Sequence, residues 1–362
     1  MNLKLRGNIG EMKIYFIVHG NARTGMGHIM RSISLAEAFK MCGHEVIFFS
    51  KYEQGISLLR KLDMEVYEIS SETYFGGQSF FYGSPEELDK DIITIRKWMI
   101  KKADVIIVDS YNVSRSFFEN LGKLTNCLVY IDDLNFFSYP VDILVNGTAS
   151  AFDMGYEKTQ SAQLLLGLKY NQVRSGFSSL PLRKINGSIT DILITTGNGD
   201  PFHITEKILG ILMSVKRFWG IKYHIIVGGG FEKNIWSDTS VINNEQIVLY
   251  DNPSNMCEIM LKCDVAISAG GSTLYELAAC GVPTIVFAYA DNQLLHIKAL
   301  EREGLLKYIG YYDKLDSNQL VGYIDYLTNN LNVWKKLVLK QQTLIDGNGC
   351  NRIENKIEHF TR

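Results

Sequence analysis

The stretch that decides the fold is RTGMGHIMRSISLAEAF, from Arg23 to Phe39, preceded by KIYFIV, from Lys13 to Val18. KIYFIV is short, apolar and partly β-branched, which is typical of a strand buried on both faces of a parallel sheet. The glycines permit a tight turn, and the apolar residues after them recur at helical spacing. A strand, a glycine turn and a helix in this order predict the start of a doubly wound α/β domain.

Similar apolar runs alternate with helix-like segments in both halves of the chain. The predicted strands are Lys13–Val18, Glu45–Phe49, Asp104–Asp109, Leu128–Ile131 and Asp142–Val145, then Asp191–Thr195, Lys222–Val227, Gln246–Tyr250, Asp264–Ser268 and Thr284–Phe287. This repeated alternation predicts two Rossmann-like domains with parallel sheets, facing each other across a cleft. Ligands of such sheets bind at the carboxyl ends of the strands.

A chain of 362 residues is long enough for two such domains. Leu168–Asp191 groups Gly, Ser and Pro residues and is the expected linker, with the boundary near Pro181. We therefore expect an extra or disordered N-terminal extension over 1–12, an N-terminal domain over 13–180, a C-terminal domain over 181–345 and a helical tail over 346–362.

The composition excludes several classes of protein. A net charge of -2 gives no electrostatic basis for binding nucleic acid or an anionic membrane. No apolar run reaches about 18 residues, and the first residues lack the apolar core of a signal peptide, so we expect a cytoplasmic protein without stable membrane insertion. The 6 cysteines and 7 histidines lack zinc-like spacing, which predicts neither metal nor cofactor. A monomer is the working assumption.

The first candidate ligand loop contains Gly25, Gly27 and His28, followed by Arg31. Backbone N–H groups at the start of a helix, together with the helix dipole, favour an anion. For His28 itself, the spacing is equally consistent with a capping or packed histidine and with a functional one.

The second candidate loop lies in SAGGSTLYELAACGVPTIVF, from Ser268 to Phe287. Its backbone N–H groups suit a diphosphate, and Glu276, one helical turn further on, suits ribose hydroxyls. The residues expected to supply those N–H groups are Gly270, Gly271, Ser272 and Thr273. The pair Thr273 and Glu276 is equally consistent with a capping box.

Three further motifs follow predicted strands. TTGNGD, with Gly197 and Asn198, is a glycine-rich ligand loop or a plain turn, and no G-K-[ST] follows it. Asn292 and Gln293 offer amide groups to a ligand or merely begin a helix. The acids Asp109, Asp132 and Asp133 suit a glycosidase pair or, more commonly, strand-end turns.

Taken in order, these motifs resemble the UDP-sugar hydrolases of the pseudaminic acid pathway and their spore-coat polysaccharide relatives. The resemblance extends over nearly the whole chain up to about residue 310. The residues that carry it are G-x-G-H-x-x-R at Gly25–Arg31, Asp109-Ser110-Tyr111, Ile131-Asp132-Asp133, Asp142–Asn146, Leu165–Tyr170, Arg174, Phe177, Gly271–Glu276 and Asp291–Gln293.

The resemblance implies the GT-B fold, similar to the N-acetylglucosaminyltransferase of peptidoglycan synthesis. It implies a UDP-sugar substrate, UDP-2,4-diacetamido-2,4,6-trideoxy-β-L-altropyranose, cleaved by water with inversion and without a metal. His28 maps onto the catalytic histidine and Tyr111 onto a tyrosine near the sugar, while the loop with Glu276 maps onto the UDP site. The segment Val18–Thr24 is shorter than in that family and lacks its acid, so another nucleotide sugar stays open.

The chemistry of such a reaction fits these residues. UDP is a good leaving group, so the reaction needs a base for water and a positive field on the diphosphate. A neutral imidazole supplies the first, and helix N-termini supply the second. A carboxylate pair is then unnecessary, and Asp109 and Asp132 become loop-shaping groups or sugar ligands. Two alternatives stay open: a GT-B glycosyltransferase with a sugar or lipid acceptor, and a nucleotide-sugar binding protein without catalysis.

Overall fold

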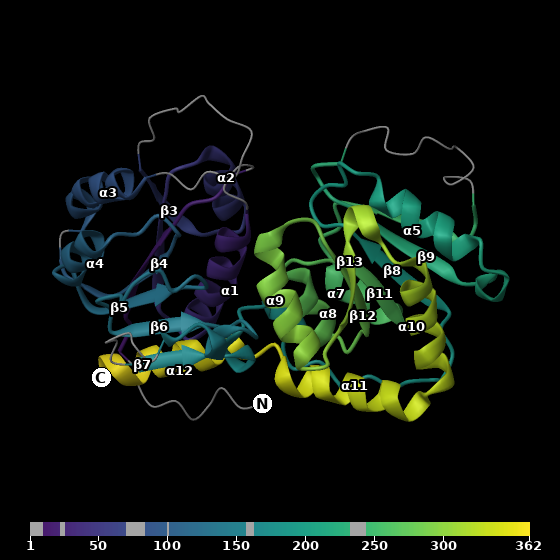
Figure 1. Ribbon diagram of the computed structural model, residues 1–362. Coiled ribbons are helices and arrows are strands. Elements are labelled where there is room, and N and C mark those ends of the chain that lie inside the picture. The colour runs from purple at the N-terminus through teal and green to yellow at the C-terminus, as the bar shows by residue number, and fades with distance from the viewer. Residues whose placement is uncertain (1–9, 22–25, 70–83, 100, 157–162, 232–243) are drawn as a thin grey trace. The chain divides into compact units, whose positions relative to one another are not determined.

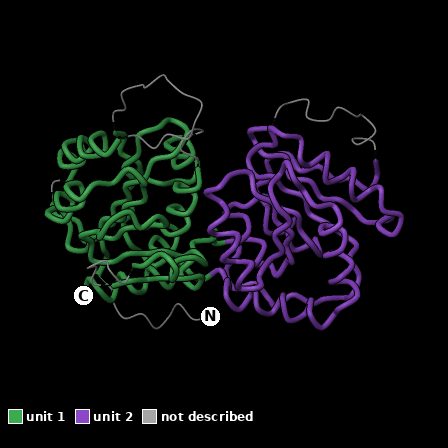
Figure 2. The backbone as a smooth tube through the Cα atoms, viewed as in Figure 1, with its two compact units in different colours: residues 1–175, 348–362 green, residues 176–347 purple. Residues whose placement is uncertain are grey.

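The computed structural model describes residues 10–21, 26–69, 84–99, 101–156, 163–231 and 244–362. The chain divides into two compact units, residues 1–175 with 348–362 and residues 176–347, coloured separately in Figure 2. The chain passes from the first unit to the second after Ser175, which lies within the expected linker but before the expected boundary at Pro181.

The first unit contains a seven-stranded parallel sheet in the order β3-β2-β1-β4-β5-β6-β7. The strands are β1 (Lys13–Val18), β2 (Glu45–Ser50), β3 (Glu65–Glu68), β4 (Ala103–Asp109), β5 (Thr125–Ile131), β6 (Ile143–Asn146) and β7 (Gln163–Leu166). The helices are α1 (Gly27–Met41), α2 (Glu53–Lys61), α3 (Pro85–Trp98), α4 (Arg115–Gly122) and α12 (Gly349–Thr361).

Side chains alternate between the two faces of this sheet and build two cores. In β1, Phe16 packs with Phe39 of α1 in one core, and Ile17 packs in the other core, with Phe118 of α4. Because helices cover both faces, the central strands are almost wholly apolar, which is why the sequence predicts them.

The C-terminal helix α12 belongs to the first unit. This helix, yellow in Figure 1, packs against α1 and β5, and Ile353 and Ile357 are fully buried in the core that α1 also lines. Gly349 lies so close to Asn171 that a Cβ there would approach the Asn171 carbonyl oxygen to 2.0 Å. The segment expected to be a helical tail is therefore helical over Gly349–Thr361, and it completes the core of the first unit.

The second unit contains a six-stranded parallel sheet in the order β10-β9-β8-β11-β12-β13. The strands are β8 (Asp191–Thr195), β9 (Lys222–Val227), β10 (Ile247–Asp251), β11 (Val265–Ala269), β12 (Thr284–Ala288) and β13 (Lys307–Tyr311). The helices are α5 (Ile204–Met213), α7 (Met256–Lys262), α8 (Thr273–Ala279), α9 (Asp291–Arg302), α10 (Ser317–Asn329) and α11 (Leu331–Leu344). In the described part of the chain, no helix is both long and apolar enough to cross a membrane.

Each strand predicted from the sequence is present, with its ends shifted by at most three residues. The structure adds β3, β7 and β13, and all three are edge strands. Their residues are largely half-buried or exposed, so they lack the continuous apolar run on which the prediction relied.

Candidate active site

The site in the first unit begins at the N-terminus of α1. Met26 is the N-cap residue and makes no side-chain capping bond, so His28 is not the cap of this helix. His28, Arg31 and Ser32 are spaced by three and four residues and therefore share one face of α1. That face meets the carboxyl end of β4, because β1 and β4 pair in parallel with Val18 opposite Asp109.

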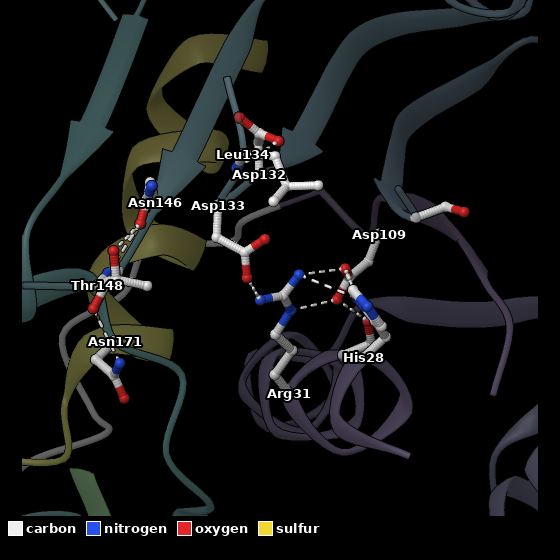
Figure 3. A network of polar contacts seen from close by, with 12 residues as sticks. His28, Arg31, Asp109, Asp132, Asp133, Leu134, Asn146, Thr148 and Asn171 are labelled. Atoms are coloured by element: carbon white, nitrogen blue, oxygen red, sulfur yellow. Dashed lines mark hydrogen bonds and ion pairs between the residues drawn. The ribbon is translucent and has the colours of Figure 1, made fainter. Parts of the chain in front are cut away.

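Asp109 is the centre of this site, as Figure 3 shows. Its side chain is 1% exposed, and Oδ1 lies 2.6 Å from Nδ1 of His28. Arg31 donates from Nε to Oδ2 at 2.7 Å and from Nη2 to Oδ1 at 2.6 Å. The hydroxyl of Ser32 donates to Oδ2 at 3.3 Å. Both carboxylate oxygens are thus occupied by protein donors, which favours a positioning role for Asp109 over direct sugar binding.

These contacts assign the tautomer of His28. An ionised carboxylate only accepts hydrogen bonds, so Nδ1 of His28 must donate to Asp109. Nη2 of Arg31 lies 3.1 Å from the same Nδ1, but two donors cannot bond each other. That short contact arises because both groups share Oδ1 as their acceptor. In the neutral ring the basic lone pair is then on Nε2, the arrangement of a general base oriented by a carboxylate.

Arg31 connects this pair to a second carboxylate. Its Nη1 donates to Oδ2 of Asp133 at 2.9 Å. The phenol of Tyr111 hydrogen-bonds the side chain of Asp133, and its ring lies edge-on to the imidazole of His28, with centroids 4.5 Å apart. Four side chains from α1 and two strand ends therefore surround His28.

The electrostatics keep both acids ionised. Burial raises the pKa of Asp109, but the charges and hydrogen bonds of Arg31 and His28 outweigh it and bring that pKa well below its ordinary value. The pKa of Asp133 is lowered by the same balance, with Tyr111 contributing a hydrogen bond. Burial, and then the charge of Asp133, raises the pKa of Tyr111 far above its usual range, so its phenol stays protonated.

Asp132 belongs to a different network. It accepts hydrogen bonds from the backbone of Leu134 and Asn135, at 3.2 and 2.8 Å, and from the phenol of Tyr156 at 2.5 Å. Burial raises its pKa. These contacts fix the loop after β5, so Asp132 and Asp109 do not face one another as a glycosidase pair.

In the second unit, the loop after β11 is shaped by Gly270 and Gly271. A Cβ on Gly270 would come within 2.4 Å of Cδ1 of Ile297 in α9, whereas a Cβ on Gly271 would meet nothing within 4 Å. The side-chain oxygen of Gln293 lies beside Gly270 and accepts from the backbone N–H of Tyr289 at 2.8 Å. The loop therefore packs closely against α9 at Gly270, whereas Gly271 has free space beside its Cα.

The helix after this loop, α8, begins at Thr273 and carries Glu276 in its first turn. Its N-cap residue is Ser272, and no side-chain hydrogen bond caps it. The capping box that the sequence also allowed, with Thr273 as the cap, is therefore not formed. Asn292 is exposed in the first turn of α9, one strand further along the sheet.

The TTGNGD loop after β8 packs against a second glycine loop. The carbonyl of Asn198 accepts from the N–H of Gly230 at 2.8 Å, and a Cβ on Gly228 would lie 2.5 Å from that same carbonyl oxygen. Asp200 accepts from the first two N–H groups of α5, from Ile204 and Thr205, both at 2.8 Å. A protein carboxylate thus occupies the helix N-terminus at which an anion would otherwise bind.

The structure brings most of the predicted residues to the expected strand ends. In the first unit, Gly27, His28, Arg31, Asp109 and Tyr111 lie together, while Gly25 is outside the described residues. Sequence reasoning missed Asp133 and Ser32 as partners of this cluster. Helical spacing from His28 was the available signal for Ser32. It also missed the packing role of Gly228–Gly230, although three glycines directly after an apolar run mark a close approach.

One group of described residues has the side chains of a metal site: His44, Glu354 and Glu358. Nδ1 of His44 accepts from the backbone N–H of Met12 at 3.3 Å, so the ring carries its proton on Nε2, which faces Glu354 at 3.9 Å. Arg362 pairs with Glu358 at 2.7 Å. A protonated Nε2 has no lone pair to offer, which makes this cluster a poor metal ligand set.

The chain is similar to known proteins over its second unit and over most of its length. Residues 190–342, inside the second unit, match the family model described as glycosyltransferase family 28 C-terminal domain. Over 340 residues the chain is 28% identical to an uncharacterized protein of Methanocaldococcus jannaschii, covering 90% of this chain and 64% of that protein. It is 20% identical over 349 residues to the spore coat polysaccharide biosynthesis protein SpsG of Bacillus subtilis, covering 94% of this chain and 96% of that one.

A third relative is the pseudaminic acid cytidylyltransferase and UDP-2,4-diacetamido-2,4,6-trideoxy-beta-L-altropyranose hydrolase of Helicobacter pylori. It is 27% identical over 207 residues, which are 56% of this chain and 37% of that protein. The chain thus spans less than two thirds of the length of the archaeal and Helicobacter relatives.

Solved structures identify the fold. MurG of Acinetobacter baumannii superposes with a TM-score of 0.68 at 13% identity, over 96% of this chain and 99% of MurG. The glycotransferase of kitacinnamycin superposes with a TM-score of 0.69 at 13% identity, over 97% and 99%. The predicted fold class, two Rossmann-like parallel-sheet domains of the GT-B type, is confirmed.

Proposed function

We propose that this protein is a nucleotide-sugar hydrolase that releases UDP from a UDP-linked sugar, with His28 as the base that activates water. The observation that carries the proposal is the 2.6 Å contact between Nδ1 of His28 and Oδ1 of Asp109. A buried carboxylate that fixes the tautomer of a histidine prepares the other ring nitrogen to accept a proton. The similarity to the Helicobacter protein, whose name includes a UDP-sugar hydrolase, supports the same reaction.

In the proposed reaction, the oxygen of a water molecule attacks the anomeric carbon of the sugar. Nε2 of His28 takes a proton from that water, and the resulting imidazolium is stabilised by Asp109. The bond between the anomeric carbon and the phosphate oxygen breaks, and its electron pair leaves with UDP. Because water attacks opposite the leaving group, the sugar is released with inverted anomeric configuration. The proton on His28 then passes to solvent.

The second unit is proposed to bind the UDP moiety. The backbone around Gly271, Ser272 and Thr273 is assigned to the diphosphate, and Glu276 to ribose hydroxyls. Two observations favour this loop over the one after β8. No side chain caps α8, whereas Asp200 already caps α5. Gly271 has open space where a Cβ would stand, so a ligand can approach its backbone. Asn292 and Gln293 flank the same loop, while Gly197 and Asn198 are assigned a shaping role.

The alternative function is that of a glycosyltransferase, in which an acceptor hydroxyl replaces water. The match of the second unit to the family 28 C-terminal domain favours it. The same residues serve both reactions, because His28 can deprotonate a sugar or lipid hydroxyl as readily as water. The two reactions differ only in what reaches the anomeric carbon.

The deciding experiment measures UDP release by NMR from a panel of UDP-sugars, with EDTA present and no acceptor added. We expect wild-type protein to release UDP and His28→Ala to be inactive while still binding UDP. Asp89→Asn is a matched control, because Asp89 bonds Ser114 and Ser116 away from this cluster. Release that requires an added acceptor would establish the transferase instead. Binding of UDP-sugars without turnover under either condition would leave a binding protein.

A further inference from the structure

A second buried polar cluster in the first unit has no part in the proposed reaction. It consists of His19, Lys51 and Asp91. Nε2 of His19 lies 3.4 Å from Oδ2 of Asp91, and Nζ of Lys51 lies 2.9 Å from the same oxygen. The three side chains are only 8%, 8% and 4% exposed.

The strand register places this cluster at the carboxyl ends of the strands, where the candidate active site also lies. Val18, the last residue of β1, pairs with Asp109, the last residue of β4. His19 is the next residue, and Lys51 directly follows β2 on the other side. Neighbouring strands are about 4.8 Å apart. The backbone of His19 is therefore about one strand spacing from the segment that carries Asp109 and Tyr111.

His19 is the unusual member of the cluster. Both of its ring nitrogens are buried, and among the described residues neither makes a hydrogen bond of good geometry beyond the 3.4 Å approach of Nε2 to Asp91. Buried polar atoms are nearly always well hydrogen-bonded, so an imidazole with only one long contact to a carboxylate is unusual here. Burial lowers the pKa of His19, outweighing the nearby Asp91, so the ring is neutral at neutral pH. A neutral ring presents one N–H donor and one acceptor lone pair.

We infer that His19 binds an uncharged substituent of the sugar, a hydroxyl or an N-acylamino group, and so selects the sugar. Both groups supply a hydrogen-bond acceptor and a donor, which matches the two ring nitrogens. A phosphate matches less well, because it offers acceptors only and Lys51 is already paired with Asp91. The inference rests on the proposed function, since it places a nucleotide sugar at His28. His19 then determines specificity and takes no part in bond breaking.

The test compares the affinities of UDP, UDP-glucose and UDP-N-acetylglucosamine by titration calorimetry. The two sugars differ in one substituent, a hydroxyl or an N-acyl group. We expect wild-type protein to favour one of them, and His19→Phe to reduce that preference at least tenfold while its affinity for UDP changes less than twofold. His19→Gln, which keeps a donor and an acceptor, should retain part of the preference.

His44→Phe is the matched control. His44 is a buried histidine of the same unit, with a side chain 1% exposed. It directly precedes β2 and so lies at the amino ends of the strands, away from the candidate active site. It should leave the preference unchanged. An undiminished preference in His19→Phe, or no preference in the wild type, would overturn the inference while UDP binding still supports the proposed function. If the wild type binds neither UDP nor the sugars, the proposed function fails and this inference with it. Should His19→Phe not fold, a reduced preference in His19→Gln supports the inference and an unchanged preference overturns it.

Discussion

Arg31 donates to both carboxylate oxygens of Asp109, at 2.7 and 2.6 Å, and thereby holds in place the group that orients His28. Its remaining bond, to Asp133, ties the end of β5 to the same guanidinium. The planar fork of arginine matches a carboxylate in this two-point manner, which lysine cannot reproduce. The candidate catalytic group therefore depends on a network that lies almost entirely below the protein surface.

The first prediction concerns His28. Replacing it with alanine removes the proposed base, and we expect the rate of UDP release to fall by about 10²–10⁴-fold. UDP affinity should change little, because UDP is assigned to the second unit. Single-turnover kinetics and calorimetry separate the two effects. Unchanged turnover in His28→Ala would refute the role of this residue.

The second prediction concerns Asp109→Asn. The amide Nδ2 can donate to Nδ1 of His28, which would move the ring proton to Nε2 and abolish the base. We expect kcat to fall at least about 10-fold with little change in KM. The variant also leaves Arg31 with less compensation, so the free energy of unfolding should drop by about 3–5 kcal/mol. Steady-state kinetics and urea unfolding measure both, and Asp89→Asn should change neither.

The third prediction follows from the lowered pKa values of Asp109 and Asp133. Below about pH 5 the unfolded chain binds protons that the folded chain does not, because an ordinary Asp pKa is about 3.9. The stability that these acids contribute is thus complete above that pH and is lost as the pH falls toward their folded pKa values. Urea unfolding between about pH 3 and 5 should show a shallower pH slope for Asp109→Asn than for the wild type. If the unfolding free energies of the two proteins had equal pH slopes, the pKa of Asp109 would not be lowered in the folded state.

The fourth prediction separates two neighbouring glycines. Gly270→Ala forces a methyl group against Ile297 and should destabilise the second unit by about 1–3 kcal/mol. Gly271→Ala meets no protein atom within 4 Å and should leave the stability unchanged. It should still weaken UDP binding, because the methyl group occupies the space assigned to the diphosphate. Thermal unfolding and calorimetry distinguish these results, and full UDP affinity in Gly271→Ala would exclude this loop.

The fifth prediction tests the role of α12. Ile353 is fully buried in the core of the first unit, so Ile353→Ala should cost about 2–5 kcal/mol of unfolding free energy there. Asn351→Ala, on the exposed side of the same helix, is the control. Hydrogen exchange should locate the loss of protection in the first unit. A loss confined to residues 176–347 would show that α12 does not support the core described above.

Sequence alone was sufficient for the central strands and for the loops that follow them. A strand covered by helices on both faces must be apolar along its whole length, and the residue after it must turn, so both features are visible locally. The edge strands β3, β7 and β13 were not predicted, because partial cover allows polar residues such as Glu65 and Lys307 within them. The sequence also did not predict that α12 packs in the core of the first unit, because an apolar helix face does not specify which core it joins.

Sequence by itself determined that His28 follows a glycine turn at the start of a helix, and that acids end the neighbouring strands. Only the tertiary structure decided which acid pairs with which base. The parallel register pairs Val18 with Asp109 and so brings His28 and Asp109, about 80 positions apart, together at the carboxyl ends of the strands. There Arg31 holds Asp109 against His28, whereas Asp132 bonds a separate network. The same register sets His19, the residue after Val18, beside the segment that follows Asp109. Contacts of this kind depend on strand order, and strand order is fixed by packing across the whole sheet.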